Sequence, residues 1–235
     1  MWRRSLLRGA GAAAIAAATP AIVRADEIVD VDMRLVIAVD VSRSIDEEEA
    51  HLQRQGYLEA LADQRVLDAM MGGPLQRMAI AYVEWAGTHY QRTAIDWTLI
   101  DSPGAAATFA AQLEASPMTS QSWTAVGAAL AYAAAKFDEP LFRSTRKVID
   151  VSGDGKTNNG PPAEIVRDEL VKRGIVINGL PILSDRPNFG RPSEADLDTY
   201  YEEKVIGGTG AFMVVATGFG DFGRAIRSKM TREIS

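Results

Sequence analysis

The sequence predicts an α/β fold, a doubly wound and mostly parallel sheet with helices on both faces. Continuous apolar runs of strand length, such as Met33–Val39, are typical of strands that are buried on both faces. Segments of helix length separate these runs along the chain. Because strands that alternate with helices form parallel sheets covered on both sides, the alternation indicates this fold class.

Residues 33–99 are expected to supply three strands and one long helix. After the strand at Met33–Val39, the segment Asp46–Leu67 is charged and carries apolar residues at helical spacing, which predicts a helix. A Gly-Gly-Pro sequence at 72–74 breaks the chain, and Arg77–Trp85 is the second strand. Gln91–Leu99 alternates more in polarity, so we expect an edge strand that pairs with the second strand as a hairpin.

The chain from residue 103 onward continues the alternation. Further helices are expected at Pro103–Ala115, Ala125–Phe137, Pro162–Lys172, Glu194–Lys204 and Asp221–Arg232. Further strands are expected at Lys147–Val151, Ile175–Leu180 and Ala211–Ala216. A proline in the first turn supports the first of these helices, and Gly174 ends the third. We find no linker and no internal repeat, which favours a single domain.

Composition narrows the function classes. The chain has 235 residues, no cysteine and a formal net charge of −6. The missing cysteines exclude disulfides, thiolate zinc sites, cysteine nucleophiles and a lipid-anchor cysteine. Removal of residues 1–25 would take away four of the 25 basic residues and none of the 31 acidic ones, which leaves a net charge of −10. Such a surface favours cations and argues against general nucleic-acid binding.

Residues 1–25 have the three-part layout of a secretory signal peptide. A positive start precedes a short alanine-rich apolar run, and small residues at Val23 and Ala25 fit a cleavage site. The start resembles a twin-arginine signal; an ordinary secretory signal and an N-terminal amphipathic helix are the alternatives. We therefore expect a periplasmic or secreted domain over residues 26–235, without a transmembrane segment.

Polar side chains follow two of the buried strands and precede the alanine-rich helix. Asp40, Ser42 and Ser44 come directly after the first strand. Asp154 follows a later strand, and Thr124 precedes the helix. Because ligands bind such sheets at the carboxyl ends of the strands, we expect these side chains to converge. Two carboxylates and several hydroxyls suit Mg²⁺, with Mn²⁺ or Ca²⁺ as alternatives.

The Asp-x-Ser-x-Ser pattern at 40–44, followed by Thr124 and by Gly-Asp-Gly at 153–155, resembles the metal-ion-dependent adhesion site of a von Willebrand factor A domain. The resemblance runs from Met33 to Arg232. One bacterial subgroup, exported A-domain-like proteins of unknown function, is similar at Ile149–Gly155, Ile177–Leu180 and Val205–Phe212. The resemblance implies a six-stranded sheet with one antiparallel edge strand.

The resemblance also implies roles for the matched positions. Ser42 and Ser44 would bind the metal through their hydroxyls, and Thr124 would bind it directly when a ligand is engaged. Asp40 and Asp154 would act directly or through water. The alternative interpretation is that the serines and the threonine only cap helices.

Two neighbouring residues are candidates for a ligand-binding rim. Arg43 departs from the expected pattern, because a cation beside the ion would either weaken metal binding or hold an anionic ligand. Trp123 adjoins Thr124 in the chain. The polar loop at 184–193 is either a plain surface loop or a specificity loop on the same face.

The sequence therefore predicts a metal-dependent, adhesion-type protein-binding module and not an enzyme. Its partner would be a protein that presents an Asp or Glu carboxylate to the ion. The alternatives are a metal-dependent hydrolase that uses the same ion to activate water, and a structural domain with a vestigial site. A hydrolase would lack an evident general base, because both carboxylates are committed to the metal.

The export signal generates the first testable prediction. Replacing Arg3 and Arg4 with lysine keeps the positive charge but removes the twin-arginine pair, so precursor should accumulate in the cytoplasm. Cell fractionation and immunoblotting of the precursor and the mature chain would measure this. Normal export of the double variant would contradict the twin-arginine route and leave an ordinary secretory signal.

Overall fold

The computed structural model describes residues 28–183 and 196–235. Its main sheet has five strands in the spatial order β4-β3-β2-β6-β7. These strands are β2 (Met33–Asp40), β3 (Met78–Trp85), β4 (Gln91–Ile100), β6 (Arg146–Gly153) and β7 (Ile175–Pro181). All neighbours pair in parallel except β4, which pairs antiparallel with β3 at one edge. The predicted class, a mostly parallel sheet with an antiparallel edge strand, is confirmed.

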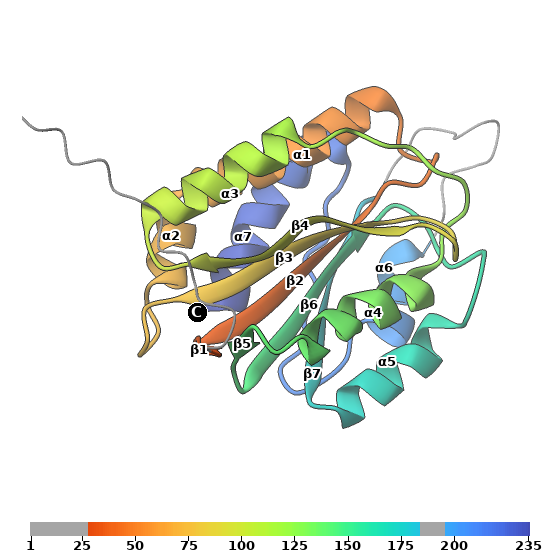
Figure 1. Ribbon diagram of the computed structural model, residues 1–235. Coiled ribbons are helices and arrows are strands. Elements are labelled where there is room, and N and C mark those ends of the chain that lie inside the picture. Colours follow the sequence, from red (N-terminus) through yellow and green to blue (C-terminus); the bar gives the residue numbers. More distant parts are fainter. Residues whose placement is uncertain (1–27, 184–195) are drawn as a thin grey trace, which may run out of the picture.

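Helices cover both faces of the sheet (Figure 1). One face carries α1 (Glu47–Ala62), α2 (Gln64–Met70), α3 (Pro103–Ala115) and α7 (Phe222–Ile234). The other face carries α4 (Val126–Ala135), α5 (Ala163–Lys172) and α6 (Leu197–Tyr200). Two short strands, β1 (Val29–Asp30) and β5 (Phe142–Arg143), form a separate parallel pair that the sequence did not predict.

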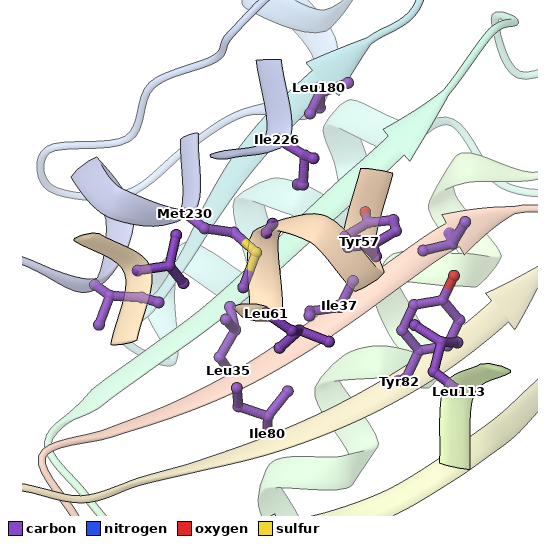
Figure 2. Packing of buried hydrophobic residues seen from close by; sticks show 14 of the residues in the cluster. Leu35, Ile37, Tyr57, Leu61, Ile80, Tyr82, Leu113, Leu180, Ile226 and Met230 are labelled. Carbon is purple, nitrogen blue, oxygen red and sulfur yellow. The ribbon is translucent and has the colours of Figure 1, made fainter. Parts of the chain in front are cut away.

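Each face of the sheet has its own apolar core. Successive side chains of β2 point to opposite faces, so Leu35 and Ile37 pack with α1, α3 and α7, whereas Val36 packs with α4 and α5. Figure 2 shows the first of these cores, in which Tyr57 of α1 and Ile226 of α7 meet the strand side chains. Every residue of β2 and β3 is buried, which explains the continuous apolar runs.

Three predicted elements have different bounds in the structure. The long helix expected at Asp46–Leu67 is two helices, because Asp63 is extended and its side chain accepts a hydrogen bond from Arg65 N at the start of α2. The alanine-rich helix ends at Ala135 and continues as a 3₁₀ turn. The helix expected at Glu194–Lys204 begins at Leu197 and ends in a π-helical turn; Glu194 lies outside the described residues.

The sixth strand of the expected sheet is not a continuous strand. Residues 211–216 run parallel to β7 and form isolated bridges at Met213 and Ala216. Backbone hydrogen bonds join this segment to β7 residues such as Gly179. The ladder is interrupted because Phe212 N donates to the side-chain Oδ1 of Asn178 at 3.0 Å. The sheet therefore has five strands plus a partly bonded edge segment.

Two expectations concern residues outside the described part of the chain. The signal peptide at 1–25 and the polar loop at 184–193 both lie there. Within residues 28–183 and 196–235, no helix combines the length and the apolar character needed to cross a membrane.

A charged cluster is buried between α7 and the sheet. Lys229 Nζ lies 2.5 Å from Asp150 Oδ1 and 3.1 Å from Glu233 Oε1. Asn178 Nδ2 donates to the same Glu233 oxygen at 2.6 Å. Burial raises the pKa of Glu233 to about 7; Lys229 opposes this shift and Asp150 adds to it. One cation faces two carboxylates here, so a proton on Glu233 leaves the cluster neutral.

This cluster predicts that stability falls as the pH rises from about 5 to about 7. In this range native Glu233 keeps a proton that the unfolded chain, with an ordinary pKa near 4.5, has already lost. Across this range the free energy of unfolding of the wild type should fall by an amount on the order of 1 to 3 kcal/mol. In the variant Glu233→Gln this fall should be absent. Urea unfolding at several pH values would measure it, with exposed Glu114→Gln as the control. Equal pH profiles for wild type and Glu233→Gln would contradict the assignment.

Candidate functional site

Sheet topology brings the predicted residues to one place. The chain leaves β2 toward β3 on one side, and β6 pairs with β2 on the other, so strand order reverses between β2 and β6. In this pairing Val39 lies opposite Ser152. The next residues, Asp40 and Gly153, are therefore neighbours at the carboxyl ends of the two strands.

The loop after β2 is organised around Asp40, which is fully buried. Ser42 N donates to Asp40 Oδ1 at 2.7 Å, which turns the loop back over the strand end. Ser42 Oγ and Ser44 Oγ are 2.7 Å apart, and Ser44 Oγ donates to Asp154 Oδ1 at 2.6 Å. Hydroxyls thus link the loop after β2 to the loop after β6, as the alternating Asp-x-Ser-x-Ser spacing predicts.

Thr124 reaches the same place from the segment before α4. Thr124 N donates to Asn158 Oδ1 at 2.9 Å, and Thr124 O accepts from Asn158 N at 2.9 Å. The Thr124 hydroxyl lies against Gly155, the residue after Asp154, because a Cβ on that glycine would lie 3.6 Å from Thr124 Oγ1. Hydrogen bonds therefore join Asp40, Ser42, Ser44 and Asp154 into one chain, and Thr124 lies beside Gly155, the residue that follows Asp154.

Gly153 provides the room that Asp40 occupies. A Cβ at Gly153 would lie 2.9 Å from Asp40 Oδ2 and 3.0 Å from the hydroxyl of Tyr201. Both oxygens are buried and have no hydrogen-bond partner within the described ranges. The site therefore contains a buried carboxylate oxygen whose bonding capacity is unused, and any larger residue at position 153 would displace it.

Electrostatics at the site favour a cation. Burial raises the pKa of Asp40 well above its ordinary value, and the nearby charge of Asp154 raises it further. The hydroxyl and backbone N–H of Ser42, together with the Asp154 N–H, offset part of this rise. Each carboxylate disfavours the ionised form of the other, and a cation between them would favour ionisation of both.

The donor set fits a hard divalent ion. Two carboxylates and three hydroxyls supply oxygen ligands of the kind that Mg²⁺, Mn²⁺ and Ca²⁺ take, and the unpartnered Asp40 Oδ2 is free to accept a cation or its water. No group of three or more His, Cys, Asp or Glu side chains suited to a metal occurs in the described part of the chain. Any metal here would therefore depend on the hydroxyls.

The two rim candidates are both exposed. Arg43 lies between the two serines of the loop, and its N–H donates to Gln121 O at 2.7 Å. Trp123 is 61% exposed, the most exposed large apolar side chain of the described chain. Its φ of +74° lies in the left-handed region, which costs a non-glycine residue energy. The hydrogen bonds of Thr124 hold this conformation in place.

Sequence reasoning missed several supporting residues. Asn158 anchors Thr124, Gln121 pairs its backbone with the Ser42 loop, and Tyr201 lies beside Asp40. Asn158 stands in a polar turn before Gly-Pro-Pro, which was a signal for a turn only. Gln121 and Tyr201 carried no local signal, because their roles arise from contacts between segments far apart in the sequence.

Comparisons with known proteins agree with this fold. Residues 30–235 match the family described as "Protein of unknown function (DUF1194)". The search of curated proteins found no match. Among solved structures the chain is similar to proximal thread matrix protein 1 from the mussel byssus, with 14% identity and a TM-score of 0.65 over 86% of this chain and 47% of that one.

Two bacterial structures are also similar. BatB from Bacteroides thetaiotaomicron has 19% identity and a TM-score of 0.52, over 85% of this chain and 99% of that one. A von Willebrand factor type A protein from Catenulispora acidiphila has 14% identity and a TM-score of 0.58, over 87% of this chain and 43% of that one. A further structure of the mussel protein is described as having a zinc-occupied MIDAS motif.

The structural likenesses define the fold, and the family match defines the family. The chain spans about half the length of the mussel protein. Identities this low are evidence for a shared fold and for nothing more. The family match, in contrast, covers nearly all of the described residues. The chain therefore belongs to the family described as protein of unknown function DUF1194, and it has the fold of a von Willebrand factor A domain.

Proposed function

We propose that this protein is an exported, metal-dependent adhesion-type module. In this proposal a divalent ion, Mg²⁺ by its oxygen chemistry, is held by Asp40, Ser42, Ser44, Thr124 and Asp154. The observation that carries the proposal is the buried, unpartnered Asp40 Oδ2 beside a second carboxylate. Asp150 and Glu233 also have buried oxygens without a hydrogen-bond partner, but both carboxylates pair with Lys229. No cation pairs with Asp40 in the part of the chain that the structure describes, so its charge would need a bound ion.

The proposed ligand is a protein segment that presents an Asp or Glu carboxylate to the ion. Asp40 and Asp154 neutralise a divalent ion, and hydroxyl ligands add no charge, so the ion still attracts one more anion. Without the ion, Asp40 and Asp154 offer nothing to which an acidic segment can bind. Exposed Arg43 and Trp123 at the rim would contact the partner, and the structurally similar matrix protein of the mussel byssus fits such a role.

Metal binding should raise the melting temperature of the protein. An ion at 100 times its dissociation constant stabilises the native state by about 2.7 kcal/mol, which corresponds to roughly 5 to 10 °C for a domain of this size. Asp40→Asn should abolish the shift and also raise the melting temperature without metal, because it removes a buried charge. Thermal unfolding with Mg²⁺, Mn²⁺, Ca²⁺ and chelator would measure both effects.

The matched control for this experiment is Asp101→Asn. Asp101 is exposed and follows the end of the antiparallel strand β4, at the opposite end of the sheet from the site. This variant should keep the full Mg²⁺ shift. Wild-type curves that do not respond to millimolar Mg²⁺, Mn²⁺ or Ca²⁺ would overturn the metal site.

Ligand binding should depend on Thr124 more than metal binding does. Thr124→Ala should weaken binding of a partner by at least about tenfold, whereas Thr124→Ser, which keeps the hydroxyl, should restore most of it. The Mg²⁺ shift of the melting temperature should change less than partner affinity in both variants. Calorimetric titration with a partner recovered by pull-down, in Mg²⁺ and in chelator, would compare them. Equal partner affinity in the two buffers would rule out binding through the ion.

A further inference from the structure

A pocket of about 550 Å³ opens beside the proposed metal site. It lies between the loop after β2, the first turns of α1, and residues 118–120. Asp40 and Ser42 form part of its wall, so the pocket and the proposed ion share residues. This volume lies within the range of about 300 to 1,000 Å³ that ligand sites occupy, and it is large enough for one or two side chains.

The far wall of the pocket is held in place by a buried ionic network. Glu84 is 1% exposed and accepts hydrogen bonds from Arg92 NH2 at 2.7 Å and from Thr119 Oγ1 at 3.1 Å. Arg54 NH1 donates to Ser116 O at 2.5 Å, which ties α1 to the start of the same segment. Because these contacts fix the wall before any ligand binds, little ordering would accompany binding.

The pocket lining is mostly apolar and has one unused donor. Ile45, Ala50 and Met118 supply apolar surface. Gln53 lines the pocket from α1, is 4% exposed, and its Nε2 has no hydrogen-bond partner within residues 28–183 and 196–235. A buried amide N–H without a partner destabilises the free protein, and a carbonyl oxygen of a ligand would relieve this cost.

Charged side chains of both signs line the pocket. Asp46 and Glu47 are acidic and Arg43 is basic, and all three lie beside the proposed ion site. The lining therefore gives a second acidic residue no charge advantage. An apolar, uncharged side chain that follows or precedes a single acidic residue matches both the ion and the lining.

We propose that this pocket, here named the Gln53 pocket, is a specificity subsite for the partner segment. It would bind an apolar side chain adjacent to the metal-bound Asp or Glu, while Gln53 Nε2 donates to a main-chain carbonyl of the same segment. The proposal rests on the proposed function, because the acidic residue on the ion places its neighbour over the pocket. Recognition is then of an acidic–apolar motif and not of a carboxylate alone.

Synthetic peptides with one Asp in different surroundings test the subsite. The Asp is flanked by Gly only, or has Leu, Phe or Glu placed one or two positions before or after it. Fluorescence polarisation measures binding to the whole protein in Mg²⁺ and in EDTA. The best Leu or Phe peptide should bind at least about tenfold more tightly than the Gly peptide, and Glu should give no gain. All binding should disappear in EDTA.

Variants in the pocket distinguish the binding of an apolar side chain from the binding of the ion. Ala50→Phe fills the pocket and should reduce the Leu-over-Gly preference to less than about twofold, with an unchanged Mg²⁺ shift of the melting temperature. Ala62→Phe, on an exposed position at the end of the same helix, is the matched control and should keep the preference. Gln53→Leu keeps the side-chain size without the donor and tests the subsite independently if Ala50→Phe does not fold.

Each outcome decides between the two proposals. Equal binding of Gly and apolar peptides in Mg²⁺ would overturn the Gln53 pocket and leave the metal-dependent function standing. Apolar peptides that bind equally in EDTA would overturn the coupling of the pocket to the ion. Binding of no peptide, despite a Mg²⁺ shift of the melting temperature, would overturn both the subsite and the carboxylate ligand.

Discussion

The pairing of β2 with β6 determines the rest of the site. It places two carboxylates, Asp40 and Asp154, at adjacent strand ends where the order of strands reverses. The pairing also requires a glycine after Ser152, since Asp40 fills the space beside Gly153. The other features of the site surround these two carboxylates. A chain of hydroxyls runs from Ser42 through Ser44 to Asp154, and hydroxyl and backbone N–H donors stabilise Asp40 in part.

The loops of the site are fixed by contacts between distant segments. Gln121 pairs with the loop after β2, and Asn158 holds both the N–H and the C=O of Thr124. These bonds maintain the left-handed backbone of Trp123 and keep its indole exposed. A strained, exposed aromatic residue would be removed easily by substitution if it had no role. Its position beside Thr124 is therefore consistent with a rim that contacts a partner.

The sequence predicted most of the fold because apolar periodicity reports burial directly. Strands such as β2 and β3, buried along their whole length, were recognised with nearly correct bounds. The break at Asp63 was missed because a single capping side chain interrupts an otherwise helical pattern. The edge segment at 211–216 was predicted as a strand because its apolar pattern persists, although Asn178 replaces one backbone acceptor. Asp40, Ser42 and Ser44 could be found from their spacing. Gln53 could not, because its proposed role rests on a buried amide without a hydrogen-bond partner in the described part of the chain.

Two buried acidic residues on neighbouring strands, Asp150 and Asp40, differ in whether a cation pairs with them. Asp150 of β6 is joined by Lys229 of α7 within a closed cluster, so its charge is balanced from inside the protein. Asp40 of β2 has Asp154 as its neighbour, and no ion pair with Asp40 occurs in the described part of the chain. Its partners are hydroxyls and backbone N–H groups, which stabilise a carboxylate without neutralising it. A buried charge without a counter-ion destabilises the protein. The arrangement at Asp40 is therefore expected where a cation binds from solution. The same strand pair thus separates a structural ionic cluster from the proposed cation site.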